Sequence, residues 1–402
     1  MGARRHTSRP PASRTSVVLL DGARVLGAKI LVSGGARCNV TNAVVTDADF
    51  NGGRRTIIRR VLRGFPVADT VAFFREIGVR LHEEPGGKLF PDSNRARDVL
   101  KALVGEATRL GVSIVTSARV ARVSKTAGGF EVRLQSGDAV AASRLVLATG
   151  GRSLPKSGSD GAGYDIARQL GHTIVPTTPA LVPLLLENDS MHREVSGVSH
   201  DAELTLWVDE AVDIRLTGSL LWTHFGISGP VTLDMSRHLL RARLENRPAE
   251  LTLNFLPGRT FDDVDGWLAL RRAKREGGRP TTSVSTMLST MLPASVAGAL
   301  LARLHVDPAT TLAHLSRDDR RRLSHALVKW PLPVTGDRGY NYAEATAGGV
   351  SLDEIDPATM TSRVCDGLSL VGEMLDVDGR IGGFNFQWAW SSARVAAGAI
   401  GT

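Results

Sequence analysis

The chain has 402 residues, 42% of them hydrophobic, and a mean hydropathy close to zero. This is enough apolar material for a large core divided among two or three domains. No apolar run approaches the roughly 18 residues of a membrane-spanning helix, and the first residues lack the apolar segment of a secretory signal. We therefore expect a cytoplasmic globular protein with no membrane partner.

The charge balance is basic, with a formal net charge of +8 and a pI near 10.0. Such a balance can indicate nucleic-acid binding. Four of the eight excess charges, however, come from the arginines of residues 1–16, which contain no acid. The remainder is spread along the chain without a basic aromatic motif, so we expect nucleic acid not to be a partner.

The two cysteines, Cys38 and Cys365, belong to no CxxC pair and to no Cys/His cluster. A disulfide framework, a dithiol redox pair and a zinc site are therefore not expected. A lone cysteine of this kind is most simply explained as a buried, unreactive thiol.

The first predicted element is a short buried strand, Val17–Leu20, which ends at Asp21. In dinucleotide-binding βαβ units an acid at a strand end holds a ribose, and a glycine-rich phosphate loop precedes that strand. Residues 1–16 contain neither a GxGxxG motif nor an apolar strand, so we expect the first strand-loop-helix unit to be missing. A glycine-punctuated loop, ILVSGGARCNVTNA (Ile30–Ala43), follows the strand.

Two conventional helices come next. The first has Pro66 in its first turn and Gly78 as its stop, and the second has Asp92 and Ser93 as capping candidates and stops at Gly111. Residues 112–144 then predict a three-stranded meander that returns into a buried strand, Leu145–Ala148.

The rest of the chain alternates in character. Small residues follow Leu145–Ala148 and precede a helix that contains Tyr164–Leu170, an arrangement that lets backbone approach a ligand closely. Residues 183–256 have a β pattern and residues 261–328 a helical, polar one. The last fifty residues return to α/β, with a strand ending at Glu373 and a helix after Gly382-Gly383.

Five collinear stretches carry a family resemblance: LVSGGARCNVTNA, LATGGRSLPKSGSDGAGYDIARQLGH, LLWTHFGISGP, ATAGGVSLDEIDPATM and GLSLVGEMLDVDGRIGGFNFQWAWSS. Together they resemble the BaiN-like (YhiN-like) flavoproteins. The resemblance implies an α/β fold, in which a glutathione-reductase-type, Rossmann-like FAD-binding domain carries an inserted β, barrel-like domain and an inserted helical domain. The implied boundaries are 17–185 and 338–402 for the FAD-binding domain, 186–258 and 329–337 for the β-rich domain and 259–328 for the helical domain, with residues 1–16 a basic leader outside the family.

The resemblance also implies a set of cofactor-binding residues. Asp21 would hold the adenosine ribose, Val120 would offer its backbone to adenine, and the helix after Gly382-Gly383 would direct its first amides at the flavin ring. The implied FAD contacts are, in full, Asp21, Ser33, Gly34, Gly35, Arg37, Cys38, Asn39, Thr41, Val120, Thr149, Gly150, Gly151, Gly372, Glu373, Asp376, Gly382, Gly383, Phe384, Asn385 and Gln387. Among them Asn385 and Gln387 are the candidate ring contacts.

His224, in LLWTHFGISGP, is the candidate proton donor on the substrate side, because histidine titrates near neutrality. The alternative is a histidine that serves only the structure of a turn. No metal site is implied.

The implied activity is that of an FAD-dependent oxidoreductase acting on a small organic substrate by hydride transfer at the flavin. Both reduction of a conjugated ketone and oxidation of an amine are open, and NADH or NADPH would have to visit the flavin transiently because no second GxGxxG is present. Two alternatives remain. One is a truncated flavoprotein remnant whose FAD binding is impaired by the missing phosphate loop, and the other is an RNA-associated flavoprotein.

Overall fold

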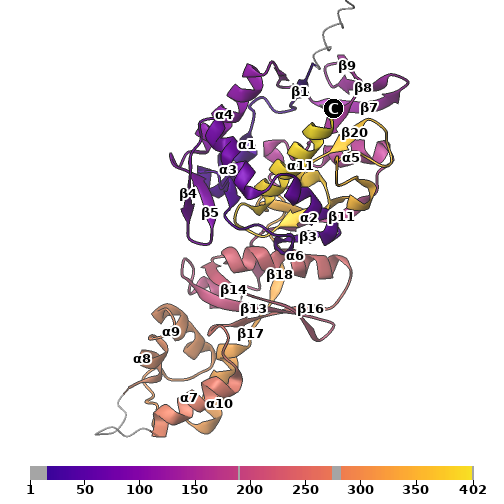
Figure 1. Cartoon of the computed structure of the whole chain (residues 1–402). Coiled ribbons are helices and arrows are strands. Elements are labelled where there is room, and N and C mark those ends of the chain that lie inside the picture. Colours follow the sequence, from indigo (N-terminus) through magenta and orange to yellow (C-terminus); the bar gives the residue numbers. More distant parts are fainter. Residues whose placement is uncertain (1–15, 189–190, 274–281, 401–402) are drawn as a thin grey trace, which may run out of the picture.

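A computed structural model describes residues 16–188, 191–273 and 282–400. The basic leader expected at residues 1–16 lies outside them, apart from Ser16. The molecule is elongated, with the two ends of the chain in one layered body and the middle of the chain extending away from it (Figure 1). No helix among the described residues is long and apolar enough to cross a membrane.

The body that contains both ends of the chain is built from parallel strand pairs, antiparallel hairpins and helices. The strands are β1 (Val18–Leu20), β2 (Thr41–Asn42), β3 (Phe50–Gly52), β4 (Leu81–Glu84), β5 (Lys88–Pro91), β6 (Ser113–Val115), β10 (Leu145–Leu147), β11 (Ile174–Ala180), β19 (Ala345–Val350), β20 (Leu368–Leu370) and β21 (Val377–Gly379). The helices are α1 (Ala28–Ala36), α2 (Arg55–Gly64), α3 (Val67–Glu76), α4 (Ala96–Arg109), α5 (Ala162–Gln169) and α11 (Phe384–Ile400).

Two parallel pairs, β1 with β6 and β10 with β20, carry the Rossmann-like character of this body. The strand expected at Val17–Leu20 forms, but the expectation that it is buried is wrong. Val18 and Leu19 are 46% and 41% exposed, because β1 has a partner on one edge only among the described strands. In β10, likewise, Leu147 is buried whereas Val146 is exposed.

The expected meander is confirmed as β7 (Val120–Thr126), β8 (Gly129–Leu134) and β9 (Ala139–Ala142), paired in that order. The two helices predicted before it are α3 and α4. Neither Asp92 nor Ser93 caps α4, however, because its N-cap is Arg95 and no side chain accepts a hydrogen bond there.

The middle of the chain forms one antiparallel sheet of seven strands, in the order β17-β16-β13-β14-β15-β12-β18. Its long hairpin reverses at Asp209-Glu210, both at positive φ. The purely β interpretation of residues 183–256 missed helix α6 (Pro230–Leu244), which begins with Pro230 after Gly229 and packs between this sheet and the first body. The strands are β12 (Leu184–Leu186), β13 (Ser199–Val208), β14 (Ala211–Thr223), β15 (Gly226–Ser228), β16 (Ala249–Asn254), β17 (Trp330–Leu332) and β18 (Val334–Asp337).

Four helices beyond the sheet form the far end of the molecule (Figure 1): α7 (Phe261–Ala273), α8 (Val284–Leu288), α9 (Ala294–Arg303) and α10 (Arg317–Val328). They confirm the helical pattern read from residues 261–328. Their buried side chains, such as Leu288 and Leu300, join those of the sheet, such as Leu204 and Trp222, in one continuous hydrophobic cluster. The helices and the sheet therefore stabilise each other, while the first body has a separate core around Phe50, Leu370 and Trp388.

Candidate functional site

The loop SGGARCN is held in a backbone conformation that few residues adopt. The helical geometry of α1 is interrupted at Ser33-Gly34-Gly35, and Gly34, Gly35, Ala36 and Cys38 all have positive φ. A Cβ on Gly35 would meet no atom within 4 Å, so this glycine faces open space. Burial raises the pKa of the Cys38 thiol to about 11, which keeps it protonated and agrees with an unreactive cysteine.

The end of this loop is joined to the start of α11. With the Asn39 amide oriented to satisfy both of its groups, its oxygen accepts from the Gly383 N–H at 3.1 Å and its nitrogen donates to the Thr41 carbonyl at 2.8 Å. Asn42 Nδ2 donates to the Gly382 carbonyl at 3.1 Å. A Cβ on Gly383 would lie 2.5 Å from the Thr41 carbonyl oxygen, so only glycine permits this approach. Residues 340 positions apart thus form one surface in front of the first turn of α11.

The side chains of Asn385 and Gln387 have internal partners. Asn385 accepts from the Gly379 N–H and donates to the Gly379 carbonyl, both at 2.9 Å. Gln387, 1% exposed, accepts from Thr41 Oγ1 at 2.6 Å and donates to the Phe65 carbonyl at 3.0 Å. Both side chains therefore fix α11 in place, and their contact with a flavin ring stays a prediction.

A second loop, Thr149-Gly150-Gly151, follows β10 and is fastened by Thr346. The Thr346 Oγ1 accepts from the Arg152 N–H at 2.8 Å and the Ser153 N–H at 3.1 Å. A Cβ on Gly151 would overlap this hydroxyl, and one on Gly150 would lie 2.6 Å from Ser159 Oγ. Small residues are thus required where strand β10 ends, as the sequence indicates.

Glu373 connects this loop to the first. One of its oxygens accepts from the Thr346 N–H at 3.0 Å, and the other forms an ion pair with Lys29 of α1. The side chains of Lys29 and Glu373 are 29% and 15% exposed. This pair places a positive and a negative group side by side near Gly151, whose Cβ would lie 3.0 Å from a Glu373 carboxylate oxygen.

The residues around Glu373 fit the hydroxyl-rich arm of a bound FAD. Two buried hydroxyls there, Tyr164 Oη and Ser159 Oγ, have no hydrogen-bond partner among the described residues. Burial, and next the nearby Glu373 carboxylate, raise the pKa of Tyr164, so the phenol stays protonated and able to donate. Unpaired buried hydroxyls destabilise a protein unless a ligand or water satisfies them, and beside glycine cradles and carboxylates they match the hydroxyl-rich arm of a dinucleotide.

Asp376 is buried and interacts electrostatically with a buried ion pair. Its carbonyl accepts from the Gly53 N–H at 2.8 Å, and burial, followed by the neighbouring Asp378, raises the pKa of its carboxyl. Asp378 is paired at 2.9 Å with Arg237 of α6, whose Nε has no hydrogen-bond partner in the described part of the chain. Asp378 thus connects the segment after β20 to helix α6, which packs against the seven-stranded sheet.

The two residues predicted to contact adenosine, Asp21 and Val120, lie near each other in the fold. Asp21 stands at the end of β1, where its side chain accepts from the Ala23 N–H at 2.8 Å and its carbonyl accepts from the Ala118 N–H at 2.8 Å. This second bond ties the strand end to the start of the meander, two residues before Val120. The two predicted adenosine contacts thus lie in neighbouring segments.

Two predicted residues are not brought into this group. Arg37 pairs with Glu84 at 2.6 Å and covers the Phe90 ring. His224 is exposed at the β14–β15 turn, where its ring packs edge-on against Phe225. In the part of the chain that the structure describes, no hydrogen bond or ring contact joins His224 to the residues around Glu373, so its role stays a prediction.

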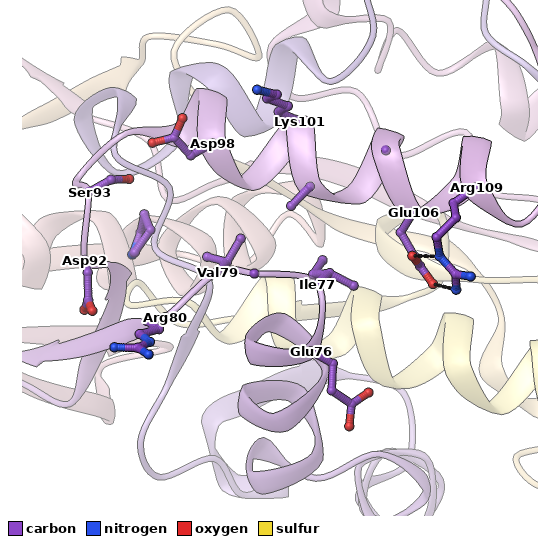
Figure 2. Close-up of a pocket in the computed structure, with 14 residues that line it drawn as sticks. Glu76, Ile77, Val79, Arg80, Asp92, Ser93, Asp98, Lys101, Glu106 and Arg109 are labelled. Carbon is purple, nitrogen blue, oxygen red and sulfur yellow. Dashed lines mark hydrogen bonds and ion pairs between the residues drawn. The ribbon is translucent and has the colours of Figure 1, made fainter.

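A separate open groove of about 890 Å³ lies between the end of α3, the end of β5 and α4 (Figure 2). Its wall alternates in charge, with Asp98 and Glu106 against Arg80 and Lys101, and Glu106 is already paired with Arg109 at 2.7 Å. None of the predicted cofactor residues lines this groove, so it is distinct from the candidate site.

The model of the HI0933-like protein Rossmann domain family matches residues 7–399. The chain belongs to this family. Among curated proteins, it is 33% identical over 380 residues to a 3-dehydro-bile acid delta(4,6)-reductase of Clostridium scindens, covering 94% of this chain and 91% of that protein. It is 34% identical over 384 residues to a ribosomal RNA dihydrouridine synthase of Escherichia coli, covering 95% and 91%.

Among solved structures, the chain is similar to a flavocytochrome c3 fumarate reductase in its open conformation, at 15% identity and a TM-score of 0.43, over 94% of this chain and 72% of that one. It is also similar to the 3-ketosteroid-delta4-(5alpha)-dehydrogenase of Rhodococcus jostii RHA1, at 14% identity and a TM-score of 0.39, over 95% and 91%.

Membership of the HI0933-like family confirms the resemblance read from the motifs. The same match confirms an α/β fold with a Rossmann-type domain. The expectation that nucleic acid is not a partner is not confirmed, because the name of one relative refers to ribosomal RNA.

Sequence reasoning missed Lys29, Thr346, Tyr164 and Arg237. Thr346 and Tyr164 lie within stretches that carry the family resemblance, so their positions were visible although their roles were not. Lys29 and Arg237 meet partners 344 and 141 positions away, and no local pattern indicates such pairs.

Proposed function

We propose that this protein uses FAD to reduce a carbon–carbon double bond conjugated to a carbonyl group. One observation carries the proposal: two relatives with differently named substrates match this chain at 33% and 34% identity over nearly its whole length. A delta(4,6)-reductase of a 3-dehydro-bile acid removes double bonds conjugated to a ketone. Dihydrouridine differs from uridine by two hydrogens across the ring double bond that is conjugated to a carbonyl. The reactions therefore share one chemistry, addition of hydride and a proton to an activated alkene.

FAD, when bound and reduced by NADH or NADPH, would supply the hydride, and the chain's residues would hold and orient the cofactor. Asp21 and the backbone near Val120 would bind the adenosine end. Glu373, Lys29, Tyr164 and the cradle of Gly150 and Gly151 would bind the hydroxyl-rich arm. Asp376 would help to hold the same arm from the loop after β20.

The start of α11 would stabilise negative charge on the ring. A 17-residue helix preceded by Gly382 and Gly383 presents first-turn amides without intrahelical acceptors and the positive end of its dipole. The SGGARCN backbone would complete this face. The same proposal includes His224 as the proton donor and NADH or NADPH as the transient source of hydride. It also takes the FAD-binding, β-rich and helical segments as the three domains.

Two other interpretations are less well supported. Amine oxidation has no counterpart in the two relatives' names. The names of the two relatives, which match 94% and 95% of this chain, describe enzymes and so do not favour an inactive remnant.

The test is anaerobic stopped-flow spectroscopy of the FAD-loaded full chain. We expect NADPH or NADH to bleach the flavin and a steroid 4,6-dien-3-one to restore its colour, while the saturated 3-ketosteroid does not. Lys29→Met should weaken FAD binding because it leaves Glu373 without its cation, whereas Lys101→Met, an exposed lysine of α4, is the matched control. Failure of both nicotinamides to reduce the flavin, together with bleaching by a primary amine, would refute the proposal.

A further inference from the structure

Helix α2 presents an exposed face on which arginine is the only charged residue type. Five arginines occur between residues 54 and 63, and no acid occurs from Phe50 to Ala68. Within the helix, Ile58, Val61 and Leu62 are buried against the core, so the arginines lie on the opposite, solvent-exposed side. The five are Arg54, Arg55, Arg59, Arg60 and Arg63.

The local acids are already used by other arginines. Asp353 pairs with Arg54 at 3.0 Å and Asp47 with Arg59 at 2.9 Å. Asp49, in the same turn as Asp47, pairs with Arg380 at 2.7 Å. Among the described residues, Arg55, Arg60 and Arg63 make no hydrogen bond or ion pair. Asp47 also interacts electrostatically with Arg55. The charges of Arg60 and Arg63 and part of the charge of Arg55 are therefore left for an external partner, and Arg55 to Arg63 covers about 12 Å along the helix.

Both ends of α2 are attached to the candidate site. Before the helix, the Gly53 N–H donates to the Asp376 carbonyl at 2.8 Å. After it, the Phe65 carbonyl accepts from Gln387 Nε2 at 3.0 Å and from Ser391 Oγ at 2.8 Å, and both donors lie on α11. Figure 1 shows α2 beside β3 at the same side of the body as α6. A ligand held along α2 would therefore lie next to the site.

We propose that this arginine face binds the phosphate backbone of an RNA whose base is the substrate of the site. The inference rests on the proposed function for the reaction at that base. Arginine matches phosphate oxygens in a bidentate geometry, and 12 Å corresponds to about three phosphates of one strand at the spacing of a stacked helix. A membrane surface fits less well, because the apolar side of α2 is buried in the core and cannot enter lipid. The relative named for ribosomal RNA, 34% identical over 95% of this chain, supports the choice of RNA.

The test measures binding of a labelled 20-nucleotide, uridine-rich single-stranded RNA to the FAD-loaded full chain, by fluorescence anisotropy at several salt concentrations. The variant is Arg55→Gln/Arg60→Gln/Arg63→Gln. The matched control, Arg317→Gln/Arg321→Gln/Arg322→Gln, removes the same charge from exposed positions on α10, at the far end of the molecule. A lysine version of the α2 triple keeps the charge.

We expect the α2 triple to weaken RNA binding at least tenfold at 0.1 M salt. The slope of the logarithm of the RNA-binding constant against the logarithm of the salt concentration should become less steep by about two. Each phosphate contact with a single strand contributes roughly 0.7 to this slope, and the variant lacks three arginines. The control should lose less than threefold, and the lysine version should retain the slope. Each of three results would overturn the inference. RNA affinity could fall equally in both glutamine triples, or the unmodified chain could fail to bind RNA at 50 mM salt. The third result is binding to phosphatidylglycerol vesicles that depends on the same arginines. Flavin bleaching by NADPH is scored separately on the unmodified chain, so failure of the proposed function is distinguishable from failure of RNA binding.

Discussion

Replacement of Thr346 by valine should damage the candidate site more than its conservative shape suggests. The residue is fully buried, and valine has nearly the same volume, so no cavity forms. What valine lacks is the oxygen that accepts from the Arg152 and Ser153 N–H groups at 2.8 and 3.1 Å and that lies 2.8 Å from Ser153 Oγ. The substitution therefore leaves two backbone donors of the loop after Gly151 without a partner.

A buried donor that loses its acceptor costs about 1–3 kcal/mol, so two such donors imply about 2–6 kcal/mol. Thr346→Ser is the control, because it keeps the oxygen and loses one methyl group, at about 1 kcal/mol. The same loop lies against Glu373, and its displacement should weaken FAD binding at least tenfold in the valine variant and less than threefold in the serine variant.

The assay is a urea titration of the FAD-loaded protein, in which flavin fluorescence reports the release of FAD. A separate titration of FAD into the apoprotein measures its affinity. The described residues form several separate hydrophobic clusters, the two largest in different parts of the molecule, so the transition to fit is flavin release rather than global unfolding. If the valine variant releases FAD within about 1 kcal/mol of the serine variant, the oxygen of Thr346 does not hold the loop and the reasoning fails.

Two further predictions test the site and its surroundings. Gly163→Ala should prevent FAD retention because its Cβ would overlap the Thr149 hydroxyl. The control Gly105→Ala, at an open helical position of α4, should leave FAD bound and stabilise the folded protein by up to about 1 kcal/mol. Equal FAD retention in the two variants would show that the close packing at Gly163 is not needed. Asp234→Asn should stabilise the protein above pH 6, because burial raises the pKa of Asp234 from 3.8 to about 6 while its oxygen accepts from the Ile381 N–H at 2.7 Å. The folded state then binds more protons than the unfolded state between about pH 4 and pH 6, so the unmodified protein loses stability as pH rises through that window. The stability gained by the asparagine variant should grow over the same window to about 1–2 kcal/mol, after allowance for partial exposure. Thermal unfolding measured from about pH 4 to pH 8 would contradict this if the gain were independent of pH.

The sequence predicted the pieces of the site better than their connections. Turn glycines, the meander and the helix after Gly382-Gly383 follow from local rules of conformation and pattern, and they formed as expected. The capping residues of α4 did not, because the helix begins at Ala96 with Arg95 as its N-cap, past Asp92 and Ser93. Helix α6 was missed although Gly229-Pro230 is a proper helix start, because its neighbours on both sides are strands and its apolar residues were read as continuing them.

Charge shows most clearly why a count along the chain is insufficient. The excess charge outside residues 1–16 looks evenly distributed when it is averaged, and on that basis nucleic acid was not expected as a partner. Folding changes the balance because Asp47, Asp49 and Asp353 neutralise Arg59, Arg380 and Arg54, while Arg55, Arg60 and Arg63 keep their charge. The spacing of arginines and buried apolar residues in α2 is helical and could have been recognised from the sequence. The three-dimensional pairing of the acids could not, since Asp353 lies 299 positions from Arg54 and Asp49 lies 331 positions from Arg380. What matters for binding a phosphate backbone is therefore the charge left unpaired on one face, and only the fold determines that quantity.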